Sequence, residues 1–146
     1  MEAPLTEKTL LVVESSPEHT RSIQQAFQDG SVYCRLEMVT NGLDAIDFLN
    51  RRGNYSGAPR PDLVLLDLNL PGKDGREVLA EIKAHSHLRR IPIVVLTLSD
   101  RVEDILTAYS LQGNCYVIKS TDIESLVQIV KRIEEFWLGI VTLPVE

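Results

Sequence analysis

Five short apolar runs alternate with five longer segments of helical period, and this alternation constrains the fold more than any other feature of the chain. Buried β-strands are short and rich in aliphatic residues, whereas amphipathic helices repeat apolar residues every three or four positions. The strand-like runs span residues 10–13, 36–38, 63–66, 93–96 and 115–118. Strict β–α alternation predicts right-handed crossovers and an open, mostly parallel α/β sheet with helices on both faces.

The second run differs from the others, because its apolar residues Leu36 and Met38 alternate with the polar residues Arg35 and Glu37. Such alternation predicts a strand with one exposed face at the edge of the sheet, while continuous apolar runs predict strands covered on both faces. The pattern suits a (βα)5 doubly wound parallel sheet with the flavodoxin-like order 2-1-3-4-5. In such sheets ligands bind beyond the carboxyl ends of the strands, at the switch point between strands one and three.

The charge balance bears on possible partners. The chain has 146 residues, with 15 Lys and Arg against 21 Asp and Glu, so its formal charge is −6. Basic residues cluster as short pairs such as Arg51-Arg52 and Arg89-Arg90. Each pair is too short for a stripe that tracks a phosphate backbone, so we expect no nucleic-acid partner.

Length and composition indicate one soluble domain. A second core would leave each half too small to bury enough apolar surface. No apolar stretch approaches the roughly 18 residues of a membrane span, and the first residues resemble no secretory signal, so we expect no membrane partner. The two cysteines, Cys34 and Cys115, form no CxxC pair and no disulfide framework. These features predict a reduced, cytoplasmic protein.

Polar residues follow the apolar runs at four of the predicted strand ends. The first run ends in Glu14-Ser15, the third in Asp67, the fourth in Thr97 and the fifth in Lys119. The predicted sheet brings these ends to one crevice. Carboxylate oxygens there can hold a hard cation such as Mg²⁺, and a central carboxylate can attack phosphorus to give an aspartyl phosphate. An ammonium and a hydroxyl would stabilise the phosphoryl oxygens.

At these positions the chain resembles the receiver domain of two-component response regulators. The resemblance covers residues 8–135, and the matching segments are residues 11–14, 65–75, 95–97 and 116–119. It implies a phosphorylated aspartate and a Mg²⁺ cofactor. The implied site residues are Asp67 as phospho-acceptor, Lys119 as phosphate-binding lysine, Thr97 as switch hydroxyl, Tyr116 as switch aromatic, and Glu14, Asp67 and the Asn69 backbone carbonyl as metal ligands.

Two further segments, residues 54–60 and 136–144, resemble the small stand-alone regulators that partner phytochromes of cyanobacteria and other bacteria. The resemblance implies a sensor histidine kinase as partner, and a homodimer through the face of the fourth helix, fifth strand and fifth helix. It implies a signalling protein that catalyses at most its own phosphorylation and dephosphorylation. We expect residues 1–146 to form a single receiver domain without an output domain. A short apolar extension from about residue 136 would fold back or cover a patch on another chain.

Two positions depart from the family pattern. The family has a second acid after strand one, a direct metal ligand, where this chain has Ser15. Because a hydroxyl is a poorer Mg²⁺ ligand than a carboxylate, we predict weakened Mg²⁺ binding; on local chemistry, Ser15 would cap the first helix. Leu98 follows Thr97, where the family has a small residue, and it would either crowd the acyl phosphate or point into the helix layer.

Several alternatives are compatible with the sequence. A pseudo-receiver would keep the fold as an interaction module, with phosphorylation impaired by Ser15 and Leu98. A flavodoxin-type nucleotide site is suggested by hydroxyl residues after strand one, but it lacks a glycine and Glu14 would repel phosphate. A phosphohydrolase of the aspartyl-phosphate kind would need an acid where Asn69 stands. The three histidines share no metal-ligand spacing and are predicted to be solvated: His19, His85 and His87.

Overall fold

The computed structural model describes residues 7–30 and 33–145, which form one α/β layer structure. Five parallel strands form a sheet in the order β2-β1-β3-β4-β5. The predicted fold class and strand order are therefore confirmed, with β2 at one edge. The strands are β1 (Lys8–Val13), β2 (Cys34–Val39), β3 (Leu63–Leu66), β4 (Ile93–Thr97) and β5 (Cys115–Ile118).

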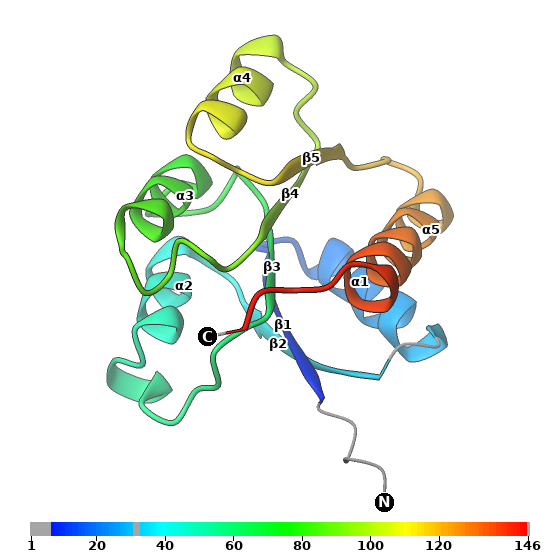
Figure 1. Cartoon of the computed structure of the whole chain (residues 1–146). Coiled ribbons are helices and arrows are strands. Elements are labelled where there is room, and N and C mark those ends of the chain that lie inside the picture. Colours follow the sequence, from blue (N-terminus) through cyan, green and yellow to red (C-terminus); the bar gives the residue numbers. More distant parts are fainter. Residues whose placement is uncertain (1–6, 31–32, 146) are drawn as a thin grey trace, which may run out of the picture.

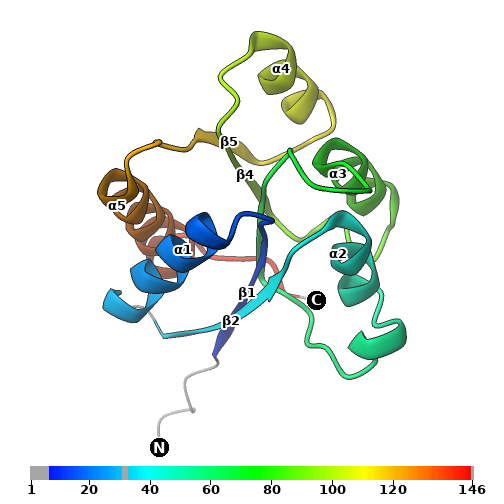
Figure 2. The same ribbon diagram turned by 180° about the vertical axis from the view of Figure 1, so that it is seen from behind.

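Helices cover both faces of this sheet. Helices α1 (Pro17–Asp29) and α5 (Ile123–Glu134) pack on one face, and α2 (Gly42–Leu49) and α3 (Gly75–Ala84) lie on the other (Figures 1 and 2). Helix α4 (Val102–Ser110) lies beyond α3, next to β5. Two short segments complete the chain: a 3-10 turn, η1 (Gly53–Tyr55), and a π-helical turn, η2 (Glu135–Ile140).

The alternation of side chains along the strands divides the core in two. Leu11 and Val13 of β1 pack with α2 and α3, whereas Leu10 and Val12 pack with α1 and α5. Since successive strand residues point to opposite faces, a strand covered on both sides must be apolar at every position. This explains the continuous apolar run of β1.

The apolar C-terminal extension folds back in part. From α5 the chain crosses toward the α2 side of the molecule (Figures 1 and 2). Trp137 and Leu138 pack against the core beside α5, and Leu143 is buried. Ile140 and Val145 remain exposed. No helix in the described part of the chain is long and apolar enough to cross a membrane.

Candidate functional site

Four polar side chains are buried together at the carboxyl edge of the sheet. Glu14 follows β1, Asp67 follows β3, Thr97 ends β4 and Lys119 follows β5. Their exposed fractions are 3%, 7%, 0% and 4% respectively. All strands run in the same direction, so residues far apart in sequence meet at this edge. The structure thus brings together the acids, hydroxyl and ammonium that the sequence predicted to converge.

Lys119 lies at the centre of the cluster. Its Nζ is 2.8 Å from Asp67 Oδ2, 2.5 Å from Glu14 Oε1 and 3.0 Å from His19 Nδ1. An ammonium has three hydrogens and only donates, so His19 Nδ1 is the acceptor in the third contact. All three hydrogens of Lys119 therefore have acceptors, which come from α1 and the ends of β1 and β3.

The prediction of a solvated His19 is wrong. The His19 side chain is 14% exposed and also lies 4.0 Å from Glu14 Oε2. It belongs to the first turn of α1, which begins directly after β1 and so lies above the same sheet edge. The sequence did carry a signal for this position, because His19 stands four residues before Ile23 and seven before Ala26, and so shares the buried face of the helix with them.

Asp67 is held by donors on both of its oxygens. Thr97 Oγ1 donates to Asp67 Oδ1 over 2.8 Å, the Asn69 backbone N–H donates to the same oxygen over 3.0 Å, and Lys119 donates to Oδ2. Hydrogen bonds to an ionised carboxylate are stronger than those between neutral groups. They hold the Asp67 carboxylate in one orientation at the mouth of the cluster.

The segment after Asp67 requires glycine at two positions, 72 and 75, for two separate reasons. Gly72 has a φ of 69°, a left-handed conformation that other residues rarely adopt. At Gly75, the first residue of α3, a Cβ would lie 2.3 Å from the Asp67 carbonyl oxygen. Asp74 caps the helix by accepting from the Arg76 N–H. These constraints bring α3 close to Asp67, and they account physically for Gly72, Asp74 and Gly75 in this segment.

Glu14 is a buried acid in an unfavourable setting. Burial raises the pKa of Glu14 above its usual value, an effect that Lys119 opposes and the nearby Asp67 charge adds to. The Ser16 N–H donates to Glu14 Oε2 over 3.1 Å. Two carboxylates thus share one ammonium, and the cluster has an excess of negative charge that suits an additional cation.

Ser16, and not Ser15, caps the first helix: Ser16 Oγ accepts from the His19 N–H over 3.3 Å, so the capping role predicted for Ser15 is wrong. Ser15 is partly exposed, and its hydroxyl has no hydrogen-bond partner among residues 7–30 and 33–145. Capping therefore does not account for a serine at position 15.

Tyr116 and Leu98 lie beside the cluster. The Tyr116 hydroxyl donates to the Ser99 carbonyl oxygen over 2.8 Å, and the half-buried ring lies under the loop between β4 and α4. Burial raises the pKa of Tyr116. Leu98 is 45% exposed, which excludes the interpretation that it points into the helix layer. It extends the chain immediately beyond Thr97, at the open edge of the site.

The donor set fits a hard divalent cation in part. Glu14 and Asp67 supply buried carboxylate oxygens, the ligand type that Mg²⁺ prefers, and Mg²⁺ commonly keeps several waters. Within the described residues, no group of three or more His, Cys, Asp and Glu side chains is arranged to hold a metal.

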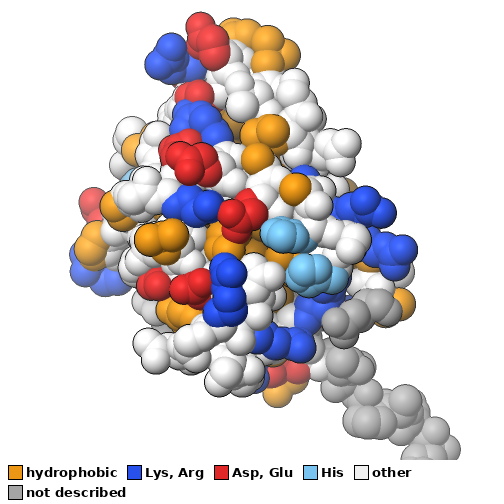
Figure 3. Space-filling view, turned by 90° about the vertical axis from the view of Figure 1, so that its left-hand side faces the viewer, with side chains coloured by type: hydrophobic (Ala, Val, Ile, Leu, Met, Phe, Trp, Pro, Cys, Tyr) orange, Lys and Arg blue, Asp and Glu red, His pale blue; other side chains and the backbone are white. Residues whose placement is uncertain are grey.

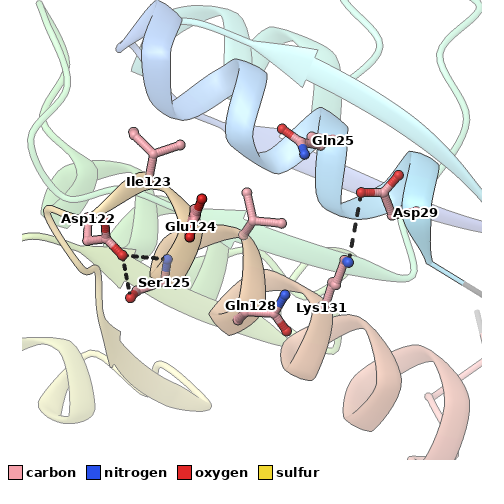
Figure 4. A pocket seen from close by; sticks show the side chains of 9 residues that line it. Gln25, Asp29, Asp122, Ile123, Glu124, Ser125, Gln128 and Lys131 are labelled. Carbon is pink, nitrogen blue, oxygen red and sulfur yellow. Dashed lines mark hydrogen bonds and ion pairs between the residues drawn. The ribbon is translucent and has the colours of Figure 1, made fainter.

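A separate polar cleft of about 590 Å³ lies between α1 and α5. Figure 4 shows Gln25 and Asp29 of α1 facing α5, with Lys131 paired to Asp29 over 3.8 Å. At the start of α5, Asp122 accepts from Ser125. None of the cluster residues lines this cleft.

Comparison with known proteins agrees with this geometry. Residues 10–131 match the family described as the response regulator receiver domain. The chain is 47% identical over 137 residues to the response regulator Rcp1 of Synechocystis sp., and the match covers 94% of this chain and 93% of Rcp1.

Two solved structures are similarly close. The structure of the Mn²⁺-bound form of Rcp1 has a TM-score of 0.91 at 47% identity, covering 94% of this chain and 99% of that one. The phosphorylated cyanobacterial phytochrome response regulator RcpA has a TM-score of 0.93 at 48% identity, covering 96% and 100%. The buried cluster, the fold and these relatives lead to one conclusion: the chain belongs to the response regulator receiver domain family.

Proposed function

We propose that Asp67 accepts a phosphoryl group from the phosphohistidine of a sensor histidine kinase. In this reaction an Asp67 carboxylate oxygen bonds to phosphorus, the phosphorus–nitrogen bond breaks, and the imidazole leaves. The observation that supports it best is the buried Asp67 carboxylate, which has Lys119 on one oxygen and Thr97 on the other. Both donors are positioned to stabilise the charge that a transferred phosphoryl group brings.

Lys119 and Thr97 have distinct roles in this proposal. Lys119 stays paired with the acyl phosphate and neutralises part of its charge. Thr97 hydrogen-bonds a phosphoryl oxygen, and so its hydroxyl turns from the carboxylate toward the new group. Tyr116 lies on the adjacent strand under the β4–α4 loop and would carry this change to α4. A local charge change then biases the conformation of an outer face.

We further propose that Mg²⁺ binds through Glu14, Asp67 and the Asn69 backbone carbonyl, with Ser15 at the position of the missing acid. The ion would neutralise charge on the phosphoryl oxygens when bound. With one carboxylate fewer than the family pattern, this chain has a weakened affinity for the ion. The similarity of the chain to the Mn²⁺-bound form of Rcp1 supports a divalent ion at this site.

For the partner we propose a phytochrome-type histidine kinase in the cytoplasm, supported by the phytochrome association of RcpA. We also propose a homodimer through the face of α4, β5 and α5, without nucleic acid. Four apolar side chains are exposed on α4 and β5: Val102, Leu106, Tyr109 and Ile118. An apolar groove of about 390 Å³ lies between β5, α5 and η2, and it is lined among others by Val117, Ile129, Phe136 and Trp137. A two-fold interface would use this same patch on both subunits.

A pseudo-receiver is the second candidate, and it is favoured by Ser15 and by the exposed Leu98 at the mouth of the site. Incubation with acetyl phosphate and Mg²⁺ separates the two functions. A mass gain of one phosphoryl group in the intact protein, absent in Asp67→Asn, supports the phospho-acceptor. An unmodified but folded protein at saturating Mg²⁺ supports the pseudo-receiver. Sedimentation of the Leu106→Glu variant tests the dimer, which this substitution should dissociate.

A further inference from the structure

The charge of the chain is distributed unevenly. Residues 50–61 and 83–92 contain six of its 15 Lys and Arg residues and two of its three His residues, but no Asp or Glu. The rest of the chain has nine Lys and Arg against 21 acids. These two segments therefore carry a net positive charge, whereas the rest of the chain is strongly acidic.

The fold joins the two segments at the end of the sheet opposite Asp67. They precede β3 and β4, so they lie where these strands begin, while Asp67 follows the end of β3. Arg60 Nη1 donates to the His87 carbonyl oxygen, and the His87 ring lies 3.3 Å from Asn50 Oδ1. A cleft of about 170 Å³ runs between the segments and is lined by residues of both.

The resulting surface is visible in Figure 3, where two adjacent pale-blue histidines have blue Lys and Arg side chains to the right and below, and a red acidic side chain to the left. His85 and His87 have ring centroids 5.5 Å apart. We call this surface the basic pole and define it by its six Lys and Arg residues: Arg51, Arg52, Arg60, Lys83, Arg89 and Arg90.

Two guanidinium groups of the basic pole, those of Arg89 and Arg90, are available for binding. Arg51 and Arg52 are also exposed, but Arg51 Nε donates to the Ala58 carbonyl oxygen over 2.9 Å and Arg52 pairs with Asp47 over 3.3 Å. In the part of the chain that the structure describes, the Arg89 and Arg90 guanidinium groups have no hydrogen bond or ion pair, although the molecule is rich in acids. Five of the six residues are Arg, whose planar fork matches a carboxylate in two parallel hydrogen bonds.

We propose that the basic pole is a docking surface for an acidic, carboxylate-rich segment of a partner protein. Charge complementarity argues for it, because the exposed guanidinium groups of Arg89 and Arg90 attract carboxylates while the acidic remainder of the molecule repels them. A long nucleic acid would extend beyond the pole and meet that acidic surface. A lipid surface is disfavoured because, among the described residues of these two segments, no large hydrophobic side chain is exposed to insert into it.

The position of the pole gives this docking a specific property. It lies at the far end of the sheet from Asp67, so a docked segment leaves the buried cluster open. Docking is therefore independent of the state of Asp67, and it does not depend on the function proposed for that residue. It would raise the local concentration of the protein near its partner while its site remains accessible.

The test is fluorescence anisotropy at low salt with a labelled peptide in which Glu and Ser alternate. A peptide of the same length with Gln in place of Glu is the probe control. The double variant Arg89→Glu/Arg90→Glu should bind the acidic peptide at least about tenfold more weakly, a change of about 1.4 kcal/mol. The variant Arg21→Glu/Arg101→Glu has the same net charge but changes two exposed arginines outside the pole, and it should bind within about twofold of the unmodified protein.

Three outcomes would overturn the proposal. These are an undetectable affinity for the acidic peptide, an equal loss in both double variants, and tighter binding of a DNA duplex or of phosphatidylserine vesicles than of the peptide. Arg89→Gln/Arg90→Gln replaces the charge-reversal variant if the latter does not fold. The Asp67→Asn variant should retain the full affinity for the peptide.

Discussion

Lys119 Nζ lies 2.8 Å from Asp67 Oδ2, and this buried ion pair joins residues 52 positions apart in sequence. The same ammonium contacts Glu14, so one cation balances two acids. We therefore expect the stability of the protein, its affinity for cations and the reactivity of Asp67 to depend on this shared charge.

Removal of the ammonium should leave two buried carboxylates without a cation. We expect Lys119→Met to lower the free energy of unfolding at neutral pH by about 3 kcal/mol, because an uncompensated buried charge is costly. Urea unfolding measures the change. The double variant Lys119→Met/Glu14→Gln should recover part of this loss of stability, because it removes one of the two buried negative charges. An equally large loss in the double variant would show that uncompensated carboxylate charge does not cause the destabilisation.

Glu14→Gln should stabilise the protein at neutral pH in the absence of divalent cations. Burial raises the pKa of Glu14, so the ionised form is less favourable in the folded state than in the unfolded chain. The native state therefore binds the Glu14 proton more tightly than the unfolded chain does. The resulting loss of stability grows as the pH rises above 4.5, the pKa of this group in the unfolded chain, and is complete above the raised pKa of the folded state. The stability difference between variant and parent should be largest near pH 7 and fade toward pH 4. A difference that does not change with pH would contradict this account.

Ser15→Asp should restore a metal-binding acid. We expect Mg²⁺ affinity to rise at least about tenfold by isothermal titration calorimetry, since a carboxylate replaces a neutral oxygen at a hard cation. Ser15→Asn is the matched control, because it adds a polar oxygen without charge and should change affinity little. Equal gains in both variants, or none in Ser15→Asp, would mean that residue 15 does not face the ion.

Leu98→Ala should increase the rate of phosphorylation by acetyl phosphate without a large change in stability. Leu98 is exposed beside Thr97, so its truncation opens the mouth of the site and costs less than about 0.5 kcal/mol. Leu43→Ala, at an exposed leucine of α2, is the control and should leave the rate unchanged. An unchanged rate in Leu98→Ala would show that this side chain does not limit access.

The sequence predicted the sheet order and the convergence of Glu14, Asp67, Thr97 and Lys119, because hydrophobic periodicity specifies the elements and parallel topology aligns their ends. It did not predict the contact of His19 with Lys119. The helical period places His19 on the same face of α1 as the buried Ile23 and Ala26, but the distance from this face to the end of β5 follows only from the packed structure.

The basic pole shows a second limit of the sequence. Arg51-Arg52 and Arg89-Arg90 are two short pairs in the sequence, and each alone is too small to indicate a binding surface. Only the crossovers before β3 and β4, linked by the Arg60 and His87 contact, bring them to one end of the molecule.

The most direct test of the central claim locates the phosphoryl group. The protein is treated with acetyl phosphate and Mg²⁺, and borohydride then reduces the acyl phosphate to a stable alcohol. Peptide mass mapping should find homoserine at position 67 and aspartate at every other Asp position, with no reduction in samples that received no acetyl phosphate. Homoserine at another position, or intact aspartate at position 67 at saturating Mg²⁺, would contradict the assignment of Asp67 as the phospho-acceptor.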